Sequence, residues 1–205
     1  MLPHPAPPLL TITLPENMAA AFASLLQHGI LYLIEQPVIL GDFLLALPGF
    51  SQKYLEERVQ TIFINGVAAD SFNAVLAPGT TVALSAAMPG LAGAIFRRQG
   101  LHGSLRSQVV KAGAAGAGEP GFVKVKFFNH IAIDRVCDLL AAGALVEGRA
   151  LYDFSAWRKD IFQAPAQLRF DREDITYTSM LEIVEKHPLI SLQIQVGTRR
   201  PVAFL

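Results

Sequence analysis

The fold is decided by residues 61–94, TIFINGVAADSFNAVLAPGTTVALSAAMPGLAGA, in which β-branched and apolar runs alternate with turn residues. The pattern predicts a strand that ends at Asn65-Gly66, a second short strand, a Pro-Gly turn and a strand over residues 80–86. That last strand leads into residues 88–93, MPGLAG, whose small side chains predict a glycine loop with accessible backbone. We expect a compact β-rich module whose loop faces a partner or ligand. Near the loop, Ser85 is the only residue able to act as an acid, base or nucleophile.

The composition is that of a globular chain without a strong electrostatic field. Of 205 residues, 52% are hydrophobic and 17% are charged, and 17 basic residues balance 17 acidic ones. Such a chain has enough apolar material for one large domain or two small ones. A balanced charge does not concentrate a polyanion or an anionic membrane surface, so we expect neither nucleic acid nor a membrane as partner. The apolar content predicts instead a protein partner or a homo-oligomeric interface.

We expect a cytoplasmic protein that carries no metal and no disulfide. The single cysteine, Cys137, has no second thiol in the chain to bond with, and no Cys or His residues are paired at metal-ligand spacing. The N-terminal segment is interrupted by prolines and lacks the basic and apolar regions of a secretion signal. The richest apolar run, residues 30–47, is broken by Glu35, Pro37 and Asp42, so no membrane span is predicted.

A glycine-rich tract, KAGAAGAGEPG at residues 111–121, divides the predicted elements. It predicts an N-terminal domain over residues 1–110, a linker or loop over 111–121 and a C-terminal part over 122–205. The C-terminal part opens with FVKVKFF, whose alternation predicts a half-buried strand, and continues with a helix over 131–142. Further strands are predicted at 9–14 and 189–196, and helices at 16–27, at 43–47 with Asp42 as N-cap, at 51–57 and at 180–186. This mixture lacks a doubly wound rhythm and is typical of the α+β class, and residue-by-residue comparison shows no internal repeat.

Four segments resemble the ubiquitin-like β-grasp sulfur carriers, namely the small subunit of molybdopterin synthase and the carrier of the thiamine pathway. The segments are GDFLL (41–45), IFING (62–66), LAPGTTVAL (76–84) and PGLAG (89–93), in the order found in those families. The resemblance implies a β-grasp-like fold for residues 1–110. It also implies a glycine tail that a partner enzyme adenylates before it carries a thiocarboxylate.

In the carrier families the glycine tail is the C-terminus, whereas this chain continues to residue 205 and contains no diglycine. A carbonyl in a peptide bond cannot be activated by ATP, so carrier chemistry would first require cleavage near Gly93. The β-grasp module is also widely reused for binding and assembly, and the fold alone therefore does not choose a function.

A second candidate site combines glycine backbone with positive charge in PGLAGAIFRRQGLHGSLRS. Amides of Gly90 and Gly93 and the guanidinium groups of Arg97, Arg98 and Arg106 can together bind a phosphate or carboxylate. The stretch lacks the Gly-Lys-Ser/Thr ending of a P-loop and the glycine order of a dinucleotide site. Its alternative interpretation is a loop with a solvated basic face.

Two other clusters carry a structural interpretation beside a functional one. His130, Asp134 and Cys137 contain the groups of a thiol nucleophile and its base, but their helical spacing favours charge balance on a helix, with Cys137 buried as a small apolar residue. An aromatic-rich stretch suits nucleobase stacking or a partner interface, and core packing is its ordinary use. The stretch contains Tyr152, Phe154, Trp157, Phe162 and Phe170.

The sequence thus favours a non-catalytic cytoplasmic binding or assembly protein that uses no cofactor. Two alternatives stay open. One is a masked sulfur-carrier or modifier precursor cleaved near Gly93, and the other is a protein that binds a small anionic ligand through residues 90–106.

Overall fold

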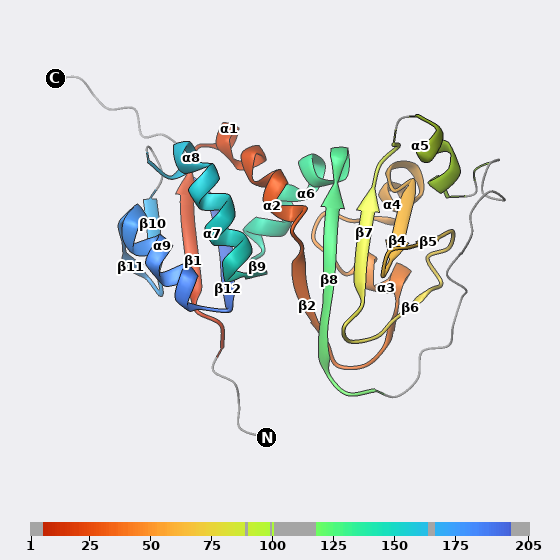
Figure 1. Ribbon diagram of the computed structural model, residues 1–205, viewed down its shortest axis with the longest axis horizontal. Helices are drawn as coiled ribbons and strands as arrows, with labels where there is room; N and C mark the ends of the chain where they lie inside the picture. Colours follow the sequence, from red (N-terminus) through yellow and green to blue (C-terminus); the bar gives the residue numbers. More distant parts are fainter. Residues whose placement is uncertain (1–5, 89, 99, 101–117, 164–166, 198–205) are drawn as a thin grey trace. The chain divides into compact units, whose positions relative to one another are not determined.

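The computed structural model describes residues 6–88, 90–98, 100, 118–163 and 167–197 (Figure 1). Its contacts divide the chain into unit 1, residues 1–25 with 136–205, and unit 2, residues 26–135. Both units combine strands of mixed direction with helices, which confirms the α+β class. The boundary at residues 111–121 stays a prediction, because 111–117 lie outside the described residues. The strand that follows this tract, residues 121–128, belongs to unit 2 together with the strands that precede the tract between residues 30 and 85.

In unit 2, five strands follow the order β2–β8–β7–β4–β5. Strands β7 and β8 run parallel, whereas β2 is antiparallel to β8, β4 to β7 and β5 to β4. A separate antiparallel pair joins β3 to β6. The strands are β2 (Ile30–Ile34), β3 (Val38–Ile39), β4 (Thr61–Ile64), β5 (Val67–Ala69), β6 (Val75–Leu76), β7 (Thr81–Ser85) and β8 (Gly121–Phe128). The helices are α3 (Leu40–Leu45), α4 (Gln52–Arg58) and α5 (Gly90–Phe96).

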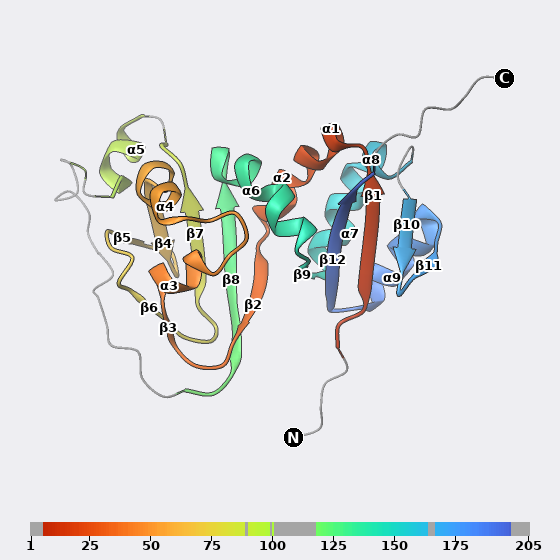
Figure 2. The same ribbon diagram turned by 180° about the vertical axis from the view of Figure 1, so that it is seen from behind.

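Alternation along β8 assigns the two faces of the unit 2 sheet. Val123, Val125 and Phe127 are fully buried, while Lys124 and Lys126 between them are half-buried. The buried face is covered by α3 and the segment before α4 (Figure 2). There the Phe43 ring lies 5.6 Å from that of Tyr32, and the Phe50 ring lies 5.9 Å from that of Phe127. The strands predicted over residues 80–86 and 122–128 are confirmed within a residue. The strand predicted to end before Asn65-Gly66 and the short strand predicted after it are confirmed as β4 and β5.

Two local predictions in unit 2 were wrong. The glycine segment forms helix α5 instead of a loop, because small side chains allow tight packing and Phe96 anchors the helix with its ring 5.2 Å from that of Phe63. Asp42 lies in the first turn of α3, and the N-cap position is occupied by Ile39 without a side-chain bond. At α4, by contrast, Ser51 is the cap and accepts a hydrogen bond from the Tyr54 amide.

In unit 1, five strands follow the order β11–β10–β1–β12–β9. Strands β1 and β12 run parallel, and the other neighbours are antiparallel. The strands are β1 (Leu9–Leu14), β9 (Ala144–Glu147), β10 (Gln167–Phe170), β11 (Glu173–Asp174) and β12 (Leu189–Val196). The helices are α1 (Glu16–Ala19), the 3₁₀ turn η1 (Ala20–Phe22), α2 (Ala23–Leu26), α7 (Gly148–Trp157), α8 (Lys159–Gln163) and α9 (Tyr177–Lys186), with α2 ending one residue into unit 2.

The aromatic-rich stretch of unit 1 serves mainly the core. The Phe154 ring lies 5.0 Å from that of Phe22 and 6.1 Å from that of Phe162, and all three side chains are buried. Trp157 is the exception, because 76% of it is exposed at the end of α7. The core interpretation is therefore confirmed for the phenylalanines at 154 and 162 and wrong for Trp157.

The two units share one strand arrangement, although the sequence comparison found no repeat. Each unit has five strands in a row, of which the second and third are parallel and all other neighbours are antiparallel. The orders are β9–β12–β1–β10–β11 in unit 1 and β2–β8–β7–β4–β5 in unit 2. Helices follow the first strand of both orders, α7 and α8 after β9 and α3 and α4 after β2. The repeat thus exists in topology alone.

Helix α6 (Asn129–Ala141) follows β8, and its residues to Arg135 belong to unit 2. Val136, Leu139 and Leu140 are buried on one side of this helix. Cys137 is exposed, so its prediction as a buried residue was wrong, because it lies one helical step beyond the buried side.

Candidate functional site

A hollow of about 490 Å³ lies along β7 of unit 2, from Thr81 at the start of the strand to Ser85 at its end, and extends to Phe128 and Asn129 at the end of β8. Because β7 and β8 are parallel, Ser85 and Phe128 lie at the same edge of the sheet. We call this feature the carboxyl-end hollow. Its lining residues are Phe63, Gly66, Thr81, Ala83, Ser85, Met88, Phe128 and Asn129.

The walls of the carboxyl-end hollow are apolar and come from the sheet face opposite the core. Phe63 on β4 pairs with Ala83 on β7, and Ala83 pairs with Lys126 on β8, two residues before Phe128. Residues at alternate positions of a strand share a face, so Phe63, Ala83 and Phe128 border one space. A concave apolar surface of this kind suits an apolar group.

The hollow also contains a polar pair held in place by backbone geometry. The Asn129 side-chain amide donates a hydrogen bond of 2.8 Å to Ser85 Oγ. Asn129 has a φ of 52°, in the left-handed region that asparagine tolerates better than most residues, and this conformation turns the chain from β8 into α6. The pair therefore marks the point where both parallel strands end.

A buried hydroxyl lies beside this pair. Thr61 is the cross-strand partner of Ser85, so both side chains lie on the same face of the sheet. Thr61 is only 1% exposed, and its Oγ1 has no hydrogen-bond partner among the described residues. Thr61 does not line the carboxyl-end hollow, so its hydroxyl is an unsatisfied group of the interior beside the site.

Unit 1 has a hollow of about 460 Å³ at the carboxyl end of β12. Ile194, Gln195 and Val196 line it together with residues of α6 that include Cys137 and Asp138.

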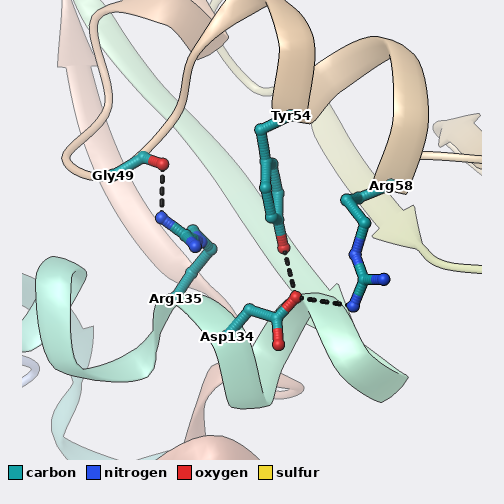
Figure 3. Close-up of polar contacts among 5 residues, drawn as sticks. All are labelled: Gly49, Tyr54, Arg58, Asp134 and Arg135. Atoms are coloured by element: carbon teal, nitrogen blue, oxygen red, sulfur yellow. Dashed lines mark hydrogen bonds and ion pairs between the residues drawn. The ribbon is translucent and has the colours of Figure 1, made fainter.

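A polar cluster in unit 2 fixes the start of α6 against α4 (Figure 3). Asp134 Oδ2 accepts hydrogen bonds of 3.1 Å from the Tyr54 hydroxyl and of 3.1 Å from Arg58 Nη2. The Arg135 guanidinium lies 4.2 Å from the centre of the Tyr54 ring and donates to the carbonyl oxygen of Gly49. The cluster positions the helix that Asn129 begins.

The chemistry of this cluster is structural. Burial raises the pKa of the Tyr54 hydroxyl, and the charge and hydrogen bond of Asp134 raise it further. A tyrosine in that state stays protonated and donates its proton to the carboxylate, so it is not a base at neutral pH. Asp134 accepts from two donors, Tyr54 and Arg58.

The predicted glycine residues have structural roles in α5. Gly90 has a φ of 76°, which favours glycine at the start of the helix. Gly93 is buried, and a Cβ at its position would lie 1.8 Å from the Met88 carbonyl oxygen. Gly93 therefore allows α5 to lie against the segment that borders the carboxyl-end hollow, and the carbonyl relevant to cleavage lies inside a helix.

The predicted arginines do not meet as a single site among the described residues. Arg97 follows α5 on the surface, and Arg106 lies outside the described residues. Arg98 lies with its guanidinium 4.0 Å from the centre of the Phe72 ring and donates from Nε to the Val59 carbonyl at 3.1 Å.

The surroundings of Arg98 oppose an anion. Burial lowers the pKa of Arg98, while the charges of Asp70 and Glu56 raise it. Asp42 and Asp70 line the same hollow of about 300 Å³ as Arg98. The anionic-ligand hypothesis stays a prediction. One of the arginines on which it depends, Arg98, shares its hollow with the carboxylates of Asp42 and Asp70.

Sequence reasoning missed Thr61, Asn129 and the bond between α4 and α6. Asn129 had a local signal, since asparagine directly after a strand and before a helix favours a positive φ. Over the described ranges, no group of three or more His, Cys, Asp and Glu side chains is arranged to hold a metal ion. No helix within those ranges is long and apolar enough to cross a membrane.

Comparison with known proteins found no matching family model, no matching curated protein and no matching solved structure.

Proposed function

We propose that this protein is a non-catalytic binding or assembly protein whose unit 2 holds an uncharged apolar group of a partner in the carboxyl-end hollow. The observation that carries the proposal is the combination of Phe63, Ala83, Met88 and Phe128 around the Ser85–Asn129 pair. An apolar concave surface with a few convergent polar groups is the ordinary form of a binding site.

The proposal includes the β-grasp-like module that the sequence predicts, and its support is limited to a mixed sheet with a parallel pair. In unit 2, β7 and β8 are the parallel pair, and α3 and α4 lie between β2 and β4 in the chain. Strand β8 follows β7 in sequence, so the unit departs from the carriers in the order of its strands.

The experiment is a titration of ¹⁵N-labelled full-length protein with indole, an uncharged aromatic probe, followed by two-dimensional NMR. We expect chemical-shift changes centred on Ser85 and Asn129 with a dissociation constant of about 1 mM, the range of a small fragment. Ala83→Phe fills the hollow and is expected to abolish these changes. Ala156→Phe, the same substitution at an exposed position of α7, is the control and should leave them unchanged. Equal shifts in the wild-type protein and Ala83→Phe would exclude the hollow as the binding site.

The masked-carrier alternative is tested separately by the intact mass of protein purified from its native host. Burial of Gly93 in α5 makes it a poor site for a protease, so we expect one full-length species. A stable fragment ending near Gly93 would favour the carrier precursor instead.

A further inference from the structure

The floor of the carboxyl-end hollow offers neutral hydrogen-bonding groups of both kinds. Ser85 Oγ accepts a bond from the Asn129 amide, which leaves the Ser85 hydrogen to be donated to a second group. Asn129 Oδ1 is an acceptor at the same place. A ligand that both accepts and donates hydrogen bonds would satisfy these groups.

The walls favour a ligand without charge. Every residue that lines the hollow is uncharged. A carboxylate or ammonium group brought into such a site loses its water without gaining an ionic partner, which is strongly unfavourable.

The lysines on the same sheet face lean away from the hollow. A Cβ at Gly29, just before β2, would lie 2.7 Å from Lys124 Cγ and 3.4 Å from Lys126 Cγ. Strand β2 lies on one side of β8 and the hollow's strand β7 on the other, so the Cγ atoms of both lysines lie toward the side of β8 away from the hollow.

Building on the proposed function, we propose that the carboxyl-end hollow recognises a peptide segment of a partner protein, with an apolar side chain against Phe63 and Phe128 and a backbone peptide group on Ser85 and Asn129. A peptide group is neutral and carries one donor and one acceptor, which matches the floor. An apolar residue of ordinary size fits a hollow of about 490 Å³.

The experiment compares three probes of the same shape and different charge by NMR titration of the full-length protein. N-acetyl-phenylalanine amide is neutral, N-acetyl-phenylalanine carries a carboxylate, and phenylalanine amide carries an ammonium group. We expect the neutral probe to bind at least about tenfold more tightly than either charged probe. Benzamide lacks the peptide backbone and is expected to bind more weakly than the neutral probe.

Substitutions test the floor. Ser85→Ala and Asn129→Gly are each expected to weaken the neutral probe about three- to tenfold, the effect of one lost hydrogen bond, and glycine keeps the positive φ of position 129. Thr80→Val is the matched control, because the Thr80 hydroxyl accepts from the Ala77 amide and does not line the hollow. Preserved two-dimensional spectra identify the variants that remain folded, and two floor variants keep the test available if one unfolds.

The outcomes separate this inference from the function on which it rests. If indole binds the hollow but the carboxylate probe binds as tightly as the neutral one, or neither floor variant weakens the neutral probe, the peptide assignment fails and the binding function stands. Benzamide binding as tightly as the neutral probe overturns the peptide source in favour of a free small amide. If neither indole nor any other probe shifts Ser85 and Asn129, the proposed function itself fails.

Discussion

Replacing Thr61 by valine is expected to stabilise the free protein, although most substitutions of buried residues destabilise. Thr61 is 1% exposed and its Oγ1 has no hydrogen-bond partner among the described residues. Valine has nearly the same shape and removes the hydroxyl, so the desolvation cost of an unsatisfied polar group disappears. That cost is about 1–3 kcal/mol, and part of it is already relieved if a water reaches the hydroxyl, so we expect a gain of about 1 kcal/mol.

The assay is urea denaturation at pH 7 followed by tryptophan fluorescence and circular dichroism. A stability change without a change in compactness moves the midpoint and leaves the slope constant. Thr80→Val provides the contrast, because its hydroxyl accepts from the Ala77 amide at 3.2 Å. Removal of that acceptor leaves the amide unpaired, and we expect a loss of about 1 kcal/mol.

A loss of stability in Thr61→Val as large as that in Thr80→Val would refute the reasoning, since it would show that the Thr61 hydroxyl is satisfied. Ser155→Ala gives an independent check in unit 1, because Ser155 Oγ is also buried without a partner among the described residues.

Three further predictions concern the structural residues of unit 2. Tyr54→Phe should lower the free energy of unfolding by about 1 kcal/mol or less, measured by urea titration at pH 7. Because the Tyr54 pKa is raised above 10.0, the stabilisation by its hydroxyl is present below pH 10 and is lost as the pH rises through the raised pKa. The wild-type protein should therefore lose more stability in alkali than the variant. Equal alkaline losses would contradict the assignment, since Tyr32, whose pKa burial also raises, is common to both proteins. Gly93→Ala should destabilise the protein by about 1–3 kcal/mol, because its Cβ clashes with the Met88 carbonyl. Leu91→Ala, on the exposed side of the same helix, should change the stability little. Similar losses of stability in the two variants would disprove the close approach of Gly93 to Met88. Arg98→Ala should lower the melting temperature, because the packing of Arg98 on Phe72 is lost. Any rise in melting temperature on adding phosphate should be the same in the variant as in the wild-type protein. A rise that is seen in the wild-type protein and is absent in the variant would restore the anionic-ligand hypothesis.

Much of the local structure of this protein follows from short-range patterns. The alternation in FVKVKFF places Val123, Val125 and Phe127 on the core face, and Asn65-Gly66 ends β4 in the expected turn. Each of these features depends on side-chain period or on a turn residue within a few positions. The α+β class follows from the same patterns.

The candidate site does not follow from such patterns. A segment rich in glycine and alanine is compatible with either a loop or a helix. Residues 90–96 form a helix in this protein, where Phe96 packs on Phe63 and Gly93 approaches Met88 closely. The bonds of Asp134 to Tyr54 and Arg58 join positions 80 and 76 residues apart, and no local period encodes them.

The sequence by itself determined which residues form strands and which of their side chains face a core, because burial imposes a period of two on each strand separately. Only the tertiary structure decided that β7 pairs in parallel with β8, and thereby that Ser85 and Asn129 meet at one edge beside Thr61. Parallel pairing joins strands through a long connection, and its partners are selected by the packing of the whole unit rather than by any neighbouring residue.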